Sequence, residues 1–539
     1  MIARNFFDSS GCSSLLKKNV VRWAASLLSG LFLVACFPKL NFHPLAWFAS
    51  LPLLLVLASE TRPWRAFGWG YLTGAVFFAG NCYWFVEVMR HYGGLSTGLA
   101  VAGLMLFVVV FSVLLGIFGL LTACVARRSA ALALLLSPFL WVAMEVARTY
   151  AVTGFPWDLL GYAVQFNGLR QIASLTGVYG LSFLAVTTSA LAAWALLDRV
   201  AKWPRLLLGG WVVFLVMGNW VFAPPALVTG RNLAVLVQPN VPLDDGEATT
   251  WAPWLNPAKL NQLVKMSLDA LSSPEASKGT ASGRGNPDHT APPLIIWAEN
   301  PAPFYFTRDR VFRDAVEAMA RDGSAYVVVN TVVPLDAGKS AITNSAVIVD
   351  PEGRQILQYD KMHLVPFGEY VPDWAFPDKI GKITAEVGNF VPGSGYRVAR
   401  TPAGVIGPFI CYEDIFPQLV RGVVLAGAEV LVNISNDAWY GDTGAAFQHL
   451  EMARLRAIEN RRYLLRATND GITAVIDPYG RVEGRIARHR TMTLSGSFNY
   501  CTGRTFYTKH GDIFAWFCVA VAVAAVLGAA VLPRREVKA

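Results

Sequence analysis

Charged residues are scarce in this chain of 539 residues. Asp, Glu, Lys and Arg make up 15% of the sequence, whereas hydrophobic residues make up 54% and the mean hydropathy is +0.41. Such a composition excludes an ordinary soluble protein, because too few polar side chains are available to cover its surface. It favours a membrane protein.

Two further patterns are missing. The formal net charge is +9, but the basic residues stand in small groups beside apolar runs and form no basic patch interleaved with aromatic residues, so nucleic-acid binding is rejected. The seven cysteines show neither the spacing of metal ligands nor that of a disulfide framework. We therefore predict no metal site, and no residue pattern requires an organic cofactor.

Eight apolar segments are each close to the roughly 20 residues that a helix needs to cross a membrane. They lie at about 22–38, 43–59, 66–89, 97–125, 130–148, 172–197, 204–223 and 513–532. The second contains prolines and is the weakest. The basic stretch 1–22 is followed by no clear small-residue cleavage site, so we expect a retained first helix rather than a removed signal peptide.

Basic residues in the connecting segments orient the predicted bundle. With the N-terminus inside, the inner segments hold many more Lys and Arg residues than the outer loops, which hold only Lys39, Arg90, Arg148 and Arg170. The positive-inside rule then places both termini in the cytoplasm and the long segment of about 224–510 on the outer side. We expect three parts: seven helices in 1–223, an extramembrane domain in 224–510, and a last helix with a cytoplasmic tail in 511–539.

The outer segment alternates strand-like and helix-like patterns, which is typical of a layered α/β domain. Predicted strands lie at 233–240, 293–300, 325–333, 345–360, 405–412, 428–435 and 473–482, and predicted helices at 308–322 and 447–465. Charged residues at 454, 456, 459, 462 and 466 have helical spacing and predict one salt-bridged helix face. Glu145 and Arg148, three apart in a membrane segment, are expected either to pair or to lie near lipid headgroups.

Three polar residues each follow a predicted strand. Glu299 ends the run IIWAE, Lys361 follows SAVIVDPEGRQILQYD, and Cys411 follows VIGPFI. A carboxylate can accept the thiol proton, an ammonium can stabilise negative charge that develops on a substrate oxygen, and a thiolate can attack. Each residue alone is more often structural, but the ordered combination favours nucleophilic catalysis.

The motifs WAEN, DKMHLVPFGEYVP and CYED resemble the nitrilase superfamily in content and order. Ala298 departs from that pattern, which often has proline before the glutamate. The chain also contains GNCYWFVEVMRHYGG, TGFPWDLLGY and SNDAWYGDTGAAFQH, and over most of its length it resembles the bacterial apolipoprotein N-acyltransferases. The resemblance implies a multi-pass helical membrane bundle of about eight helices joined to a nitrilase-like αββα sandwich, in the bacterial inner membrane with its catalytic domain in the periplasm.

The resemblance also implies the reaction. Cys411 would attack an acyl ester of a membrane phospholipid, with Glu299 as general base and Lys361 as electrostatic stabiliser, and the thioester would acylate the N-terminal amine of a diacylglyceryl-cysteine on an apolipoprotein. The expected partners are therefore a phospholipid donor and an apolipoprotein acceptor, and we expect a monomer. Glu369 would orient Lys361 or support proton transfer, and the backbone N–H of Tyr412 would be a second oxyanion donor.

Other residues are assigned with alternatives open. Glu413 either holds the cysteine loop for catalysis or is structural. The candidate substrate-binding residues are Trp439, Tyr440, His363 and Trp374, with ordinary packing as the alternative; Trp374 lies in a long loop, 364–396, that is typical of a lid. His363 and His449 also permit a Cys–His arrangement, which we rank below Glu–Lys–Cys.

Two competing functions remain. A membrane-tethered amidase that hydrolyses C–N bonds would use the same three residues, but one helix would be enough to anchor it. A transporter with an outer sensing domain would need charged or helix-breaking residues deep inside the bundle, and those are sparse. Dependence of the activity on lipid separates the transferase from the amidase.

Overall fold

The computed structural model describes residues 18–228, 230–243, 250, 252–253, 255–273, 291–299, 304–335, 341–370 and 390–531. The chain divides into two compact units. The helical unit comprises Met1–Val86, Thr97–Pro224 and His510–Ala539, and the α/β unit comprises Glu87–Ser96 and Pro225–Lys509.

The helical unit consists of apolar helices joined by short connections. Its elements are α2 (Asn19–Ala35), η1 (His43–Trp47), α3 (Leu51–Ser59), α4 (Pro63–Asn81), α5 (Trp84–Glu87), α6 (Thr97–Ala126), α7 (Ala130–Tyr150), η3 (Leu160–Ala163), α8 (Asn167–Arg170), α9 (Ala173–Thr176), α10 (Val178–Leu197), α11 (Trp203–Val221) and α20 (Ile513–Val531). Helices α4 and α6 approach closely because Gly70 and Gly119 leave room for backbone of the partner helix. A methyl group at Gly70 would collide with the carbonyl of Leu115.

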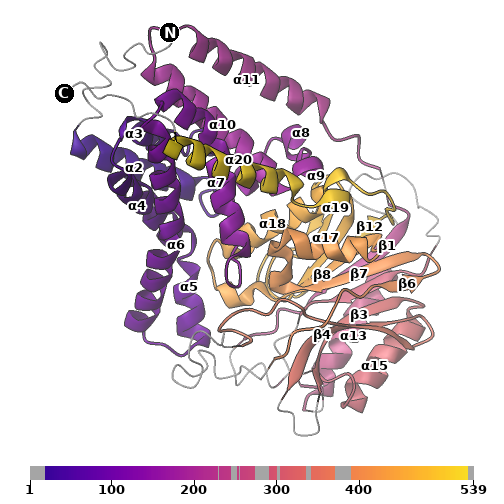
Figure 1. Ribbon diagram of the computed structural model, residues 1–539. Helices are drawn as coiled ribbons and strands as arrows, with labels where there is room; N and C mark the ends of the chain where they lie inside the picture. Colours follow the sequence, from indigo (N-terminus) through magenta and orange to yellow (C-terminus); the bar gives the residue numbers. More distant parts are fainter. Residues whose placement is uncertain are drawn as a thin grey trace. The chain divides into compact units, whose positions relative to one another are not determined.

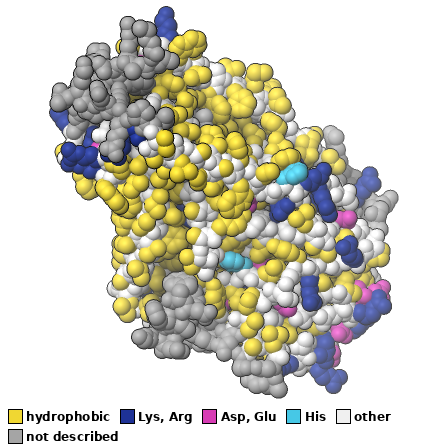
Figure 2. All heavy atoms as spheres, viewed as in Figure 1, with side chains coloured by type: hydrophobic (Ala, Val, Ile, Leu, Met, Phe, Trp, Pro, Cys, Tyr) yellow, Lys and Arg dark blue, Asp and Glu magenta, His cyan; other side chains and the backbone are white. Residues whose placement is uncertain are grey.

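In the described residues, five helices are long and apolar enough to cross a membrane, and α4 with the bent segment Trp84–His91 makes a possible sixth. The five are α6, α7, α10, α11 and α20, and two shorter apolar stretches, Asn19–Ala35 and His43–Ser59, occupy the first two predicted segments. Figure 2 shows hydrophobic side chains over much of the visible face of this unit. Exposed Leu106, Phe214 and Trp220 are consistent with helices that face lipid.

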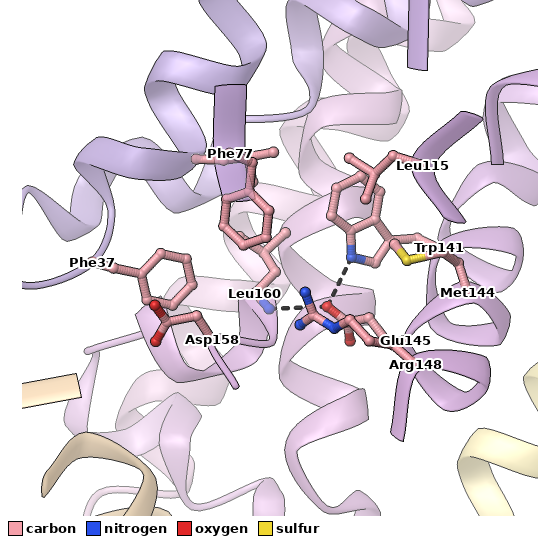
Figure 3. A pocket seen from close by; sticks show the side chains of 10 residues that line it. Phe37, Phe77, Leu115, Trp141, Met144, Glu145, Arg148, Asp158 and Leu160 are labelled. Atoms are coloured by element: carbon pink, nitrogen blue, oxygen red, sulfur yellow. Dashed lines mark hydrogen bonds between the residues drawn. The ribbon is translucent and has the colours of Figure 1, made fainter. Parts of the chain in front are cut away.

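A small cavity lies inside the helical unit, between α2, α4, α6 and α7, and its lining includes Glu145, Arg148 and Asp158 among apolar side chains (Figure 3). Its volume of about 10 Å³ is enough for roughly one water molecule. Glu145 does not form the predicted pair with Arg148; its Oε1 accepts hydrogen bonds from Trp141 Nε1 and from the backbone N–H of Leu160, both 2.9 Å long. The Arg148 guanidinium instead lies 5.5 Å from the ring centre of Phe78.

The α/β unit contains two six-stranded mixed sheets with the orders β12-β1-β2-β3-β4-β5 and β11-β10-β9-β8-β7-β6. The strands are β1 (Asn232–Gln238), β2 (Leu294–Trp297), β3 (Tyr326–Pro334), β4 (Ile342–Val349), β5 (Gln355–Asp360), β6 (Ala399–Thr401), β7 (Gly404–Ile410), β8 (Val430–Ser435), β9 (Tyr463–Thr468), β10 (Ala474–Ile476), β11 (Val482–Arg485) and β12 (Met492–Phe498). Strands β1–β3 and β7–β9 are parallel, and their apolar runs are buried on both faces.

Helices cover the outer face of each sheet, so the unit has four αββα layers (Figure 1). Helices α13 (Pro257–Leu271) and α15 (Arg310–Asp322) pack on the first sheet, and α17 (Pro417–Leu425) and α18 (Ala445–Asn460) pack on the second. Three short elements complete the unit: η2 (Val88–Tyr92), a π-helix, η6 (Cys411–Ile415) and η7 (Asp437–Tyr440), with α19 (Phe506–His510) at its end.

The predicted helix 447–465 is wrong in its last turn, and so is the predicted salt-bridged face. Helix α18 ends at Asn460 because Arg461 adopts a left-handed conformation, with φ of 51°, and β9 begins two residues later. Arg456 and Glu459 do pair, at 3.0 Å, but they are fully buried, and Arg466 lies in β9 rather than on the helix.

Candidate active site

Cys411 occupies a strained turn at the end of a buried strand. Strand β7 ends at Ile410, and Cys411 has a backbone φ of 51°, a value that residues other than glycine rarely adopt. Such strain is held in place by surrounding structure and is concentrated at functional sites. The turn continues as η6, so the thiol is presented between a rigid strand and a short helix.

Lys361 lies between two carboxylates. It follows β5, is 1% exposed, and its Nζ is 2.9 Å from Glu369 Oε1 and 3.7 Å from Glu299 Oε1. Burial lowers the pKa of Lys361, but Glu369, Glu299 and Cys411 outweigh burial and leave the pKa raised. The Lys361 amine is therefore protonated at neutral pH, and in this charged form it can stabilise nearby negative charge.

Asn344, which the sequence reasoning missed, bridges the two carboxylates. Its Nδ2 donates to Glu299 Oε1 at 2.8 Å and to Glu369 Oε1 at 3.0 Å, while its Oδ1 accepts a 2.8 Å bond from Asn330 Nδ2. Both amides come from the paired strands β3 and β4. Because an amide NH₂ group can only donate, it fixes both carboxylates as acceptors and holds them on either side of Lys361.

Glu299 keeps one oxygen open. Its Oε2 is buried and has no hydrogen-bond partner among the described residues. Burial and the charge of Glu299 raise the pKa of the Cys411 thiol, and Lys361 opposes this shift. The thiol is thus protonated at neutral pH, and it lies within the electrostatic influence of both Glu299 and Lys361.

Glu413 ties the cysteine turn to the lysine loop. Its carboxylate accepts hydrogen bonds from the backbone N–H groups of Ile410 (2.7 Å), Met362 (2.7 Å) and His363 (3.1 Å), and from the Tyr359 hydroxyl (2.8 Å). Burial raises the pKa of Glu413 to about 7. A single buried side chain therefore fixes the distance between the segments that carry Cys411 and Lys361.

The rings of both histidines are engaged by side chains other than Cys411. The ring of His363 packs on Phe416, with 3.8 Å between ring centres, and burial lowers its pKa to about 4, so the imidazole is neutral. His449 is fully buried between Asp414 and Asp437. The groups that the structure gathers around Lys361 are carboxylates and an amide.

The remaining candidates differ in their surroundings. Tyr412 is buried and its ring meets Phe416 edge to face, at 5.3 Å. Trp439 and Tyr440 belong to η7, the turn after β8; Tyr440 is buried and Trp439 is half-buried. Trp374 lies outside the described residues. Groups of three or more His, Cys, Asp or Glu side chains that could hold a metal ion do not occur in the part of the chain that the structure describes.

Comparison with known proteins identifies the class and then the family. A model of the carbon-nitrogen hydrolase family matches residues 276–496, so the α/β unit is of the nitrilase-like carbon-nitrogen hydrolase class. A model described as the apolipoprotein N-acyltransferase N-terminal domain matches residues 29–191. The chain belongs to the apolipoprotein N-acyltransferase family.

Relatives that carry this name are similar over nearly the whole length. One from Geobacter metallireducens is 35% identical and covers 95% of both chains. One from Methylococcus capsulatus is 34% identical and covers 90% of this chain and 92% of its own. Among solved structures, an amidase from Nesterenkonia sp. covers 53% of this chain and 94% of its own, with 18% identity and a TM-score of 0.36.

Proposed function

We propose that this protein transfers a fatty acyl chain from a membrane phospholipid to the N-terminal amine of the diacylglyceryl-cysteine of apolipoproteins, the last step of bacterial lipoprotein maturation. The family supports this substrate pair. The observation that carries the chemistry is the buried Lys361, held 2.9 Å from Glu369 and 3.7 Å from Glu299, in the same unit as the strained Cys411.

The first half-reaction forms a thioester. Glu299 Oε2 accepts the thiol proton, and the sulfur of Cys411 attacks the carbonyl carbon of the phospholipid ester. The Lys361 ammonium and the backbone N–H of Tyr412 stabilise the oxyanion of the tetrahedral intermediate. Its collapse breaks the C–O bond, and the lysophospholipid leaves as an alcohol with the proton returned by Glu299.

The second half-reaction forms the amide. The free amine of the acceptor attacks the thioester carbonyl, Glu299 takes a proton from the nitrogen, and the Cys411 thiolate leaves and is reprotonated. Glu369 positions Lys361 in both steps. Trp439, Tyr440, His363 and Trp374 are proposed to line the path of the acyl chain or headgroup, and Glu413 to hold the turn.

The proposed topology follows the distribution of basic residues. We place both termini in the cytoplasm of a bacterial cell, eight helices across the inner membrane, and the α/β unit in the periplasm. The proposed division is 1–223, 224–510 and 511–539. The protein acts as a monomer with no cofactor.

A transfer assay tests this function. The purified full-length protein is incubated with a phospholipid that carries a labelled acyl chain and with a synthetic diacylglyceryl lipopeptide. We expect labelled N-acyl lipopeptide from the wild type and none from Cys411→Ala, Lys361→Met or Glu299→Gln. Release of labelled free fatty acid with no lipopeptide product, or cleavage of simple amides without lipid, would instead identify an amidase or hydrolase.

A further inference from the structure

A second group of charged side chains lies buried behind the cysteine turn, and the proposed mechanism does not use it. Asp414 comes from η6, Asp437 from η7, His449 from α18 and Arg466 from β9, and all four are fully buried. Buried charges are costly unless they are paired. Charged side chains from four separate elements therefore meet at one place in the interior of the α/β unit.

The four side chains form a closed ring of ion pairs. His449 Nε2 lies 2.7 Å from Asp414 Oδ1, and His449 Nδ1 lies 2.9 Å from Asp437 Oδ1. Arg466 Nη1 lies 2.7 Å from Asp414 Oδ2, and Arg466 Nη2 lies 2.9 Å from Asp437 Oδ2. Each carboxylate therefore contacts both basic side chains.

The surroundings of His449 favour its charged form. A carboxylate oxygen lies close to each ring nitrogen, and an imidazole between two carboxylates is stabilised when both nitrogens carry hydrogen. Burial and the Arg466 Nη2 atom, 2.8 Å from Nδ1, oppose this charge, but Asp414 and Asp437 outweigh them and the pKa of His449 is raised. The ring of Tyr440, whose centre is 5.8 Å away, meets the imidazole edge to face. With two positive and two negative members, the ring is neutral.

Strand register brings this ring next to the nucleophile. Ile410 pairs with Ile434 in the parallel strands β7 and β8, so Cys411 and Ser435 follow side by side. Ser435 Oγ lies 2.9 Å from Asp437 Oδ1, to which it donates, and when its single hydroxyl hydrogen turns to the Cys411 sulfur instead, that bond favours the thiolate. Asp414 lies in the same short turn as Cys411.

Negative charge at this position opposes thiolate formation. Besides burial and Glu299, Asp437 raises the pKa of Cys411, whereas Lys361 lowers it. Cys411 in turn lies close enough to Arg466 and Tyr440 to shift their pKa values. The balance of charge in the ring therefore acts directly on the thiol.

We propose that His449 is a positioning residue whose positive charge, together with that of Arg466, compensates Asp414 and Asp437 so that the Cys411 thiolate can form. This role rests on the proposed function of Cys411 as the nucleophile. In this role His449 acts as a compensating cation and not as the partner of a Cys–His arrangement.

The test measures thiol ionisation without lipid. The full-length protein in detergent is treated with iodoacetamide across a pH series, and the labelled fraction of the Cys411 peptide is quantified by mass spectrometry. His449→Gln leaves a net charge of −1 in the ring, so we expect the midpoint to rise and labelling at neutral pH to fall by about tenfold, as one pKa unit implies. Adding Asp414→Asn restores neutrality, and the double variant should return towards the wild-type midpoint.

Structural damage should be greater in the double variant than in His449→Gln alone. A midpoint that returns towards the wild-type value therefore indicates charge compensation and not damage. Arg454→Gln is the matched control, because Arg454 also lies on α18 but pairs with Glu451 at a partly exposed position; it should leave the midpoint unchanged. If His449→Gln fails to fold, Asp437→Asn replaces it; this change leaves one positive charge in excess in the ring and should lower the midpoint, because Asp437 raises the pKa of Cys411.

An unchanged midpoint in the folded variant, or a double variant no closer to wild type than His449→Gln, overturns the proposal. Labelling needs no acyl donor, so its outcome is independent of the transfer assay. A shifted midpoint in a protein that transfers no acyl chain would refute the proposed function and leave the charge compensation standing.

Discussion

Replacing Glu413 by glutamine tests whether one buried carboxylate holds the nucleophile against the lysine loop. Glu413 Oε1 accepts from the N–H groups of Met362 and His363, and Oε2 accepts from that of Ile410. A glutamine of the same size keeps one acceptor and turns a donor towards the other N–H groups. The less costly orientation keeps the lysine loop bonded and leaves the Ile410 N–H unpaired.

One buried N–H group without a partner costs about 1–3 kcal/mol. We therefore expect Glu413→Gln to lower the Tm of the α/β unit by roughly 2–6 °C, measured well above pH 7 so that the wild-type carboxylate is ionised. Because the unpaired group immediately precedes Cys411, the rate of acyl-enzyme formation should fall by about tenfold or more, a loss of roughly 1.4 kcal/mol in transition-state stabilisation.

The assay combines thermal unfolding in detergent with a time course of acyl-enzyme formation. Glu352→Gln is the control, because Glu352 pairs with Arg354 on the surface and is far more exposed; both readouts should match the wild type. If Glu413→Gln forms the acyl-enzyme at the wild-type rate, Glu413 does not position the nucleophile. An unchanged Tm would refute the hydrogen-bond argument itself.

Three further outcomes are expected. Asn344→Ala removes the donor that holds Glu299 and Glu369 on either side of Lys361, so the rate of acyl-enzyme formation should fall by about tenfold, the effect of roughly 1.4 kcal/mol. His363 has a folded pKa of about 4 against 6.5, so the unfolded chain binds more protons and stability should fall by up to about 3 kcal/mol as the pH drops from 6.5 to 4; His363→Phe should flatten this slope. Glu145→Leu unpairs two buried N–H donors and should lower the Tm of the helical unit.

A different result in each experiment would contradict the corresponding prediction. Acyl-enzyme formation at the wild-type rate in Asn344→Ala would mean that Asn344 does not position the two carboxylates. An equal pH slope in His363→Phe would assign the loss of stability to other groups. If Glu145→Leu unfolds at the wild-type temperature, the two N–H donors are satisfied by water in the adjoining cavity.

The sequence predicted the strands that lead to Glu299 and Cys411 because their signals are local. The apolar runs of β2 and β7 are buried and each is followed by the site residue, whereas the predicted strand 345–360 is wrong in its middle: a turn at 351–353 divides it into β4 and the more exposed β5 that leads to Lys361. The family resemblance then supplied the combination. The predicted helix at 308–322 is likewise close to α15, whose N-cap Asp309 accepts a bond from Val311.

The contacts that the sequence could not predict depend on which strands pair with one another. Asn344 reaches Glu299 across 45 residues only because β3 pairs with β2 on one side and with β4 on the other, and no periodicity in the sequence predicts that pairing. Arg466 has helical spacing from Arg462, yet the left-handed Arg461 ends the helix before either residue. The lengths of the membrane helices also differ from those of the apolar runs. Helix α2 has only 17 residues, and α4 is followed by the segment Trp84–His91 after a bend of 51°.

The central claim is that Cys411 carries the acyl chain, and the intact mass of the protein purified with its native lipids tests it most directly. The account predicts a fatty-acyl adduct on the wild type that hydroxylamine removes, and for Cys411→Ser either a hydroxylamine-stable ester or no adduct. A wild-type protein that stays unmodified after phospholipid is added without an acceptor would contradict the account.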